Sequence, residues 1–62
     1  MPDRIDYEQW LKDHMHNIQG KLIGGHTYVM AAIRKDNDKT LTAVTSNRDQ
    51  AIRLIRRKYY NH

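Results

Sequence analysis

Two short runs rich in β-branched and aromatic residues, residues 27–29 and 40–45, most constrain what this chain can fold into. Between them lie three turn-forming residues, Asp36, Asn37 and Asp38. This arrangement predicts an antiparallel β-hairpin centred on Asn37. Residues 30–33 also have helix propensity, so an all-helical chain is the alternative.

The register of this hairpin is predicted from hydrophobic sorting. A turn centred on Asn37 places Ile33 opposite Leu41, and a slip of one residue would move every side chain to the other face. The face predicted to be buried holds Val29, Ala31, Ile33, Leu41 and Ala43. The other face would carry Tyr28, Met30 and Val44. Because that second face is more apolar than a solvated face, we expect these three residues to form the interface of a homodimer.

The first segment is predicted to be an amphipathic helix over about residues 4–19. Its apolar positions recur with a helical period. The residues that share this stripe are Tyr7, Leu11, His14, Met15, Ile18 and Leu22. Pro2 suits the lead-in, Asp3 or Asp6 would cap the N-terminus, and Gly20 would end the helix.

The final segment is predicted to be a second helix, capped by Ser46 or Asn47. One side is predicted to face the core and holds Ala51, Leu54, Ile55 and Tyr59. The order helix, hairpin, helix predicts an α+β fold with both helices on one face of a short antiparallel sheet. At 62 residues the chain is expected to form a single domain.

The charge of the chain is concentrated in its second half. The net charge is +4, with eight basic and three acidic residues in 32–62 against three basic and four acidic in 1–31. We therefore expect a polyanionic partner, with nucleic acid, either DNA or RNA, as the leading candidate. The predicted contacts on the final helix are Arg53, Arg56, Arg57 and Tyr60, and those at the hairpin tip are Arg34, Lys35 and Lys39.

Several other classes of protein do not fit the sequence. There is no cysteine, and the four histidines lack the spacing of a zinc site. No glycine-rich phosphate loop and no apolar run of membrane-spanning length is present. We expect a cytoplasmic binding protein without cofactor or metal, and not an enzyme. The main alternative is a regulator or inhibitor that binds an acidic protein surface.

Trp10 and Leu11, then Gly25 and His26 before a hairpin, then a basic helix, form an outline that resembles the small HicA-type messenger-RNA interferases. Those toxins have a double-stranded-RNA-binding-like fold and use a histidine as acid/base catalyst. The resemblance implies a small ribonuclease as a third alternative. The chain lacks the family's Gly-Ser-His run and its Pro-x-His element, and two strands are predicted where the family has three. No catalytic residue is assigned from it.

Overall fold

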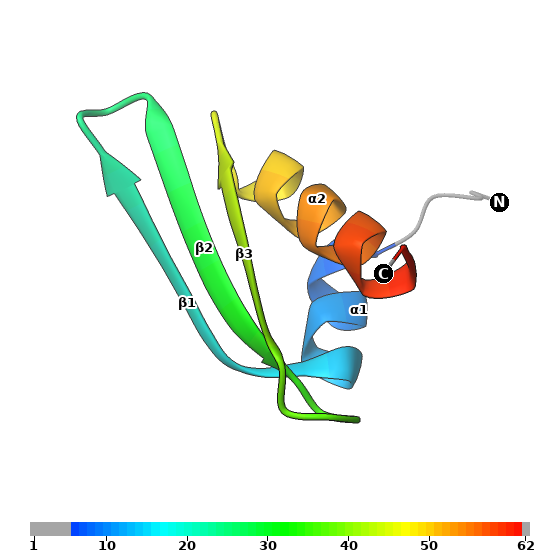
Figure 1. Cartoon of the computed structure of the whole chain (residues 1–62). Coiled ribbons are helices and arrows are strands. Elements are labelled where there is room, and N and C mark those ends of the chain that lie inside the picture. Colours follow the sequence, from blue (N-terminus) through cyan, green and yellow to red (C-terminus); the bar gives the residue numbers. More distant parts are fainter. Residues whose placement is uncertain (1–5, 62) are drawn as a thin grey trace, which may run out of the picture.

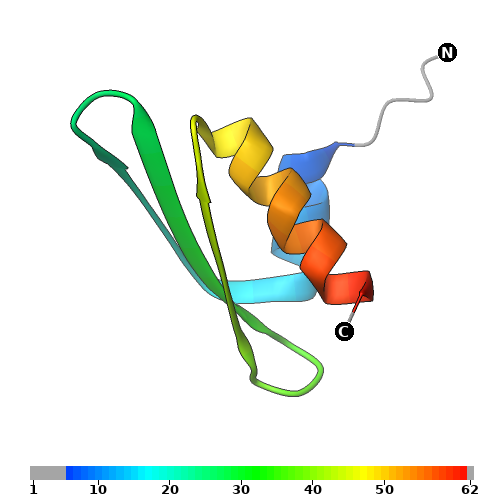
Figure 2. The same cartoon turned by 45° about the horizontal axis from the view of Figure 1, so that its top comes forward.

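The computed structural model describes residues 6–61, which form two helices and a three-stranded sheet (Figure 1). The elements in chain order are α1 (Tyr7–His14), β1 (Met15–Ile23), β2 (Thr27–Arg34), β3 (Thr40–Thr45) and α2 (Arg48–Tyr60). The sheet is antiparallel with strand order β1-β2-β3. Both helices lie on one face of it, with α2 against β2 and β3 and α1 beside α2 (Figures 1 and 2). The predicted α+β class is confirmed.

The predicted first helix is wrong beyond His14, where the chain turns into the additional strand β1. A β-bulge explains why the sequence looked helical. Asn17 adopts a left-handed conformation (φ 49°), and it and Ile18 together oppose Ala32 of β2. The extra residue lets Met15 and Ile18, three positions apart, both turn toward the helices. In a regular strand they would point to opposite faces, so the bulge reproduces a helical spacing.

The hairpin of β2 and β3 is confirmed, but its predicted register is wrong by one residue. Ile33 pairs with Thr40 and Met30 pairs with Ala43. The cause is the turn, which has four residues because Arg34 N–H donates to the carbonyl of Lys39 at 2.8 Å and closes the loop. An even loop cannot be centred on Asn37.

This shift exchanges the two faces of β2. Met30, predicted to lie at a dimer interface, is fully buried in the protein's own core. Tyr28 is half-buried on the same helix-facing side, and Val44 is exposed on the opposite side of the sheet. Val29, Ala31 and Ile33, predicted to be buried beneath the helices, lie on the outer side instead.

The core lies between the sheet and α2 and is closed by α1. Its buried members are Trp10, Leu11, Met15, Met30, Ala32, Ala43, Ala51, Ile52 and Ile55. All four residues predicted to face the core from the second helix are buried in it or packed against it: Ala51, Leu54, Ile55 and Tyr59.

Side-chain caps fix the N-termini of both helices. The Asp6 carboxylate accepts from Gln9 N–H at 3.1 Å, and the Asn47 amide oxygen accepts from Gln50 N–H at 2.9 Å. These are among the caps predicted from the sequence; Pro2 and Asp3 lie outside the described residues. Neither α1 nor α2, the helices of residues 6–61, is long and apolar enough to span a membrane.

Candidate nucleic-acid interface

The solvent-facing side of α2 carries Arg53 and Arg57, one helical turn apart. Both are exposed because the helical period turns them away from the buried side of α2. Arg53 forms an ion pair with Asp49 at 3.2 Å. Within residues 6–61, Arg57 forms no ion pair and its side chain donates no hydrogen bond. The two arginines border a shallow depression whose other lining residues are Thr45, Gln50 and Leu54.

Lys58 extends this surface toward the edge of the sheet. Its Nζ donates to the carbonyl of Thr42 on β3 at 2.7 Å, which leaves two of its three N–H groups free. Lys58 shares a second hollow with Lys39 of the β2–β3 turn. Arg53, Arg57 and Lys58 are named the basic ridge below. Lys58 was not among the predicted contacts, although the run of three basic residues at 56–58 was a signal for it.

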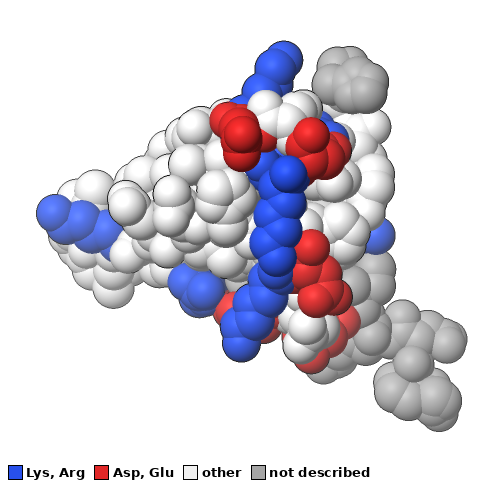
Figure 3. Space-filling model, turned by 90° about the horizontal axis from the view of Figure 1, so that it is seen from below, with Lys and Arg blue, Asp and Glu red and all other residues white. Residues whose placement is uncertain are grey.

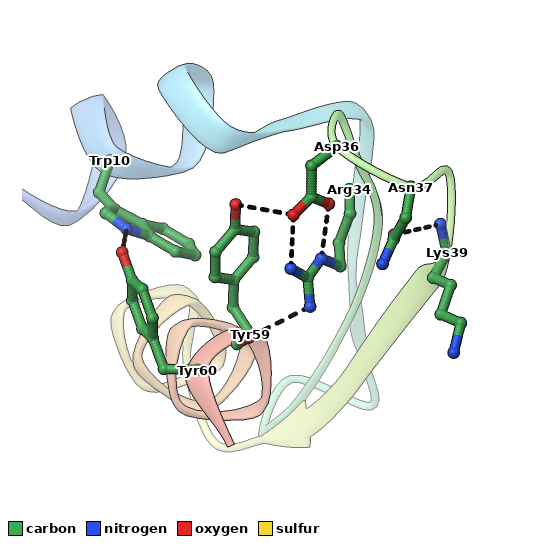
Figure 4. A network of polar contacts seen from close by, with 7 residues as sticks. All are labelled: Trp10, Arg34, Asp36, Asn37, Lys39, Tyr59 and Tyr60. Carbon is green, nitrogen blue, oxygen red and sulfur yellow. Dashed lines mark hydrogen bonds and ion pairs between the residues drawn. The ribbon is translucent and has the colours of Figure 1, made fainter. Parts of the chain in front are cut away.

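Arg56 and Tyr60, the other predicted contacts on α2, lie on its flank toward α1. Trp10 Nε1 donates to the Tyr60 hydroxyl at 3.1 Å, as Figure 4 shows. The Arg56 guanidinium lies 5.4 Å from the centroid of the Tyr60 ring, and its Nε is buried without a hydrogen-bond partner. Both residues therefore contribute to the packing of the two helices, although Tyr60 remains largely exposed to solvent.

Arg34 holds the β2–β3 turn against the end of α2 (Figure 4). Its guanidinium donates to both oxygens of Asp36 at 2.8 and 2.6 Å and to the carbonyl of Tyr59 at 3.1 Å. It also stacks over the Tyr59 ring at 3.9 Å. The hydrogen bonds from Arg34 lower the pKa of Asp36 and those to Asp36 raise the pKa of Arg34. The positive charge of Arg34 is therefore neutralised by its ion pair with Asp36.

The remaining residues of the hairpin tip are mixed in charge. Lys35 Nζ donates to the carbonyl of Lys12 at 2.7 Å, whereas the Lys39 side chain makes no hydrogen bond or ion pair in the described chain. Figure 3 views this end of the molecule, where Lys and Arg atoms run across the surface with Asp and Glu atoms directly beside them. Of the three basic residues predicted to contact nucleic acid at the hairpin tip, Lys39 is the one whose side chain contacts no other polar group of residues 6–61.

Arg48 connects three elements of the fold. It donates to the Glu8 carboxylate of α1 at 2.6 and 3.1 Å and to the Tyr28 hydroxyl of β2 at 2.8 Å. The hydrogen bond from Arg48 is the main reason that the pKa of Glu8 lies below its ordinary value of 4.5. Arg48 therefore stabilises the packing of α1, β2 and α2, although in the sequence it belongs to the basic residues of the final helix.

The histidines do not form a metal site or a catalytic pair in the described structure. No three histidine or acidic side chains of residues 6–61 are close enough together to hold a metal ion. His14 stacks on Trp10, with the ring centroids 4.8 Å apart. His26 is exposed in the β1–β2 turn, where its Nδ1 lies 2.7 Å from the carbonyl oxygen of Gly24. If Nδ1 is the donor of this contact, Nε2 is the acceptor nitrogen of the ring.

No protein-family model matches this chain, and no curated protein or solved structure is significantly similar to it.

Proposed function

We propose that this protein is a small nucleic-acid-binding module whose basic ridge on α2 contacts the phosphate backbone. The observation that carries the proposal is the placement of Arg53 and Arg57 on the exposed side of α2. Guanidinium groups pair well with phosphate oxygens, and the phosphate backbone dominates the affinity of most nucleic-acid complexes. Lys58 and Lys39, which share a hollow, would extend the contact along the edge of β3.

The helix dipole accounts for only part of this basic surface. Arg57 and Lys58 lie in the last turn of α2, where positive charge stabilises the helix. Arg53 lies a turn earlier, beyond the reach of that effect. Its i,i+4 ion pair with Asp49 offsets its repulsion from Arg57, since the two effects are of similar size. A polyanion bound along the helix would therefore gain most from Arg57, whose charge has no ion-pair partner among residues 6–61.

The same proposal includes a cytoplasmic homodimer. Self-association is expected because so short a chain leaves part of its apolar sheet uncovered. Met30 cannot be part of the dimer interface predicted from the sequence, because it is buried in the core.

The test is a fluorescence-anisotropy titration of labelled single- and double-stranded DNA and RNA oligomers at about 50 and about 200 mM salt. Affinity is expected to fall steeply with salt. On duplex DNA, Arg53→Ala and Arg57→Ala should each lower the logarithmic salt slope by about one. Lys21→Ala removes the same charge from β1, outside the ridge, and is expected to leave the slope unchanged.

Two results would replace this proposal. A folded protein that binds no oligomer at low salt would favour the regulator of an acidic protein surface. RNA cleavage without added metal that is abolished by His26→Ala would favour the ribonuclease. The third strand and the exposed position of His26 are the observations that keep the ribonuclease as a candidate.

A further inference from the structure

Tyr60, in the last turn of α2, is the one tyrosine of the four that is mostly open to solvent. It is 57% exposed, whereas Tyr7, Tyr28 and Tyr59 are partly buried. Its hydroxyl is nevertheless held by Trp10 Nε1 at 3.1 Å (Figure 4). The Tyr59 ring also contacts it in a T-shaped arrangement, with the ring centroids 4.9 Å apart. The Tyr60 ring is therefore held in place in the free protein, while more than half of the residue stays accessible.

Three arginines of α2 flank this ring. Arg53 and Arg57 precede Tyr60 by about two turns and one turn, so the three side chains share one stripe of the helix. The Arg56 guanidinium lies on the other side of the ring from Arg57, 5.4 Å from the ring centroid. No carboxylate of residues 6–61 forms an ion pair with Arg56, and its Nε is buried without a hydrogen-bond partner. An accessible aromatic ring thus lies between two guanidinium groups that have no acidic partner in the described chain.

We propose that Tyr60 stacks on an unpaired nucleobase, so that the preferred ligand of the basic ridge is single-stranded DNA or RNA. This inference rests on the proposed function and names the substrate class of the same site. Every base has a flat aromatic face, and stacking on a protein side chain is tolerant of sequence. In a duplex these faces are covered by the neighbouring base pairs. Only an unpaired strand can present them to Tyr60.

The spacing of these side chains suits one nucleic-acid strand. Along the axis of α2, Arg57 lies about 6 Å from Arg53, and Tyr60 lies about 4.5 Å beyond Arg57. A strand that follows the helix can place phosphates at the two arginines and a base against the ring. An apolar protein surface packed on Tyr60 would instead bury the neighbouring guanidinium groups, and a buried charge without a partner is costly. A nucleotide supplies both an aromatic ring and an anion.

The test compares one sequence of about 12 nucleotides as a single strand and as a duplex, in DNA and in RNA, by fluorescence anisotropy at about 50 mM salt. Wild-type protein is expected to bind the single strands about fivefold or more tightly than the duplexes, although a duplex has the higher charge density. Arg57→Ala is expected to weaken the binding of both forms, because both have a phosphate backbone.

Two variants of Tyr60 separate stacking on a base from packing against α1. Tyr60→Phe and Tyr60→Leu both remove the hydrogen bond to Trp10, so both disturb the contact between the helices. Only Tyr60→Phe keeps an aromatic ring. It is expected to retain the preference for the single strand, whereas Tyr60→Leu is expected to weaken single-strand binding about tenfold.

The outcomes distinguish this inference from the proposed function. A wild-type protein that binds the duplex as tightly as the single strand would overturn the inference and leave the proposed function intact. Unchanged single-strand affinity in Tyr60→Leu would do the same, and so would equal losses in Tyr60→Phe and Tyr60→Leu. A folded protein that binds neither form at low salt would overturn both.

Discussion

At the scale of single residues, Gly20 is a position with no room for a side chain. The Tyr28 ring packs directly over Gly20, and its hydroxyl accepts a hydrogen bond from Arg48. A Cβ at Gly20 would collide with this hydroxyl. Gly20→Ala would force Tyr28 aside and break its hydrogen bond with Arg48. We expect a loss of about 1–2 kcal/mol in the free energy of unfolding. Urea denaturation measures it, with Gln19→Ala as a control expected to change stability by less than about 0.5 kcal/mol.

The Glu8–Arg48 ion pair predicts a dependence of stability on pH. Folding lowers the pKa of Glu8 below 4.5, so the pair stabilises the protein above about pH 4.5 and is lost as the pH falls through the folded value. Because the Glu8 side chain is 49% exposed, the contribution is small, about 0.5 kcal/mol. Glu8→Gln should therefore reduce the loss of stability between about pH 5 and pH 3. Parallel melting-temperature profiles for the two proteins would contradict this.

At the scale of elements, the sequence predicts local structure well where local forces decide it. The turn at Asp36–Asp38, the strands beside it and the basic final helix follow from β propensity, turn residues and helical period. The strand β1 does not, because it depends on pairing with β2 and on a bulge at Asn17 whose apolar spacing is that of a helix. The hairpin register was missed for a related reason: the Arg34–Lys39 pair sets the loop length.

The cap of α2 distinguishes two residues that the sequence leaves equivalent. Asn47 accepts from Gln50 N–H, whereas Ser46 precedes the cap. Asn47→Ala is expected to lower the free energy of unfolding by about 1 kcal/mol because it leaves a helix N–H unsatisfied. Ser46→Ala is expected to have little effect. Thermal denaturation of both variants tests the assignment, and equal losses would show that the cap is shared.

At the scale of the whole molecule, the candidate site could be predicted only as a set of basic residues. The sequence places Arg53, Arg56, Arg57 and Tyr60 on one stripe, and the fold then divides them. Arg53 and Arg57 face solvent, while Tyr60 accepts a hydrogen bond from Trp10. Arg34 is likewise held by Asp36. The Trp10–Tyr60 contact joins residues far apart in the chain, and the Arg34–Asp36 pair depends on how the β2–β3 turn folds, so periodicity and charge counts do not reveal them.

Amide chemical shifts of the isotopically labelled protein, recorded while a nucleic-acid oligomer is added at low salt, test the central claim most directly. A protein of 7.4 kDa gives well-resolved spectra, and each residue reports separately. We predict that the largest shifts occur along the exposed side of α2, at Gln50, Arg53, Leu54 and Arg57, and that they disappear at high salt. Shifts confined to β1 and the β1–β2 turn, or no shifts at all, would contradict binding through the basic ridge.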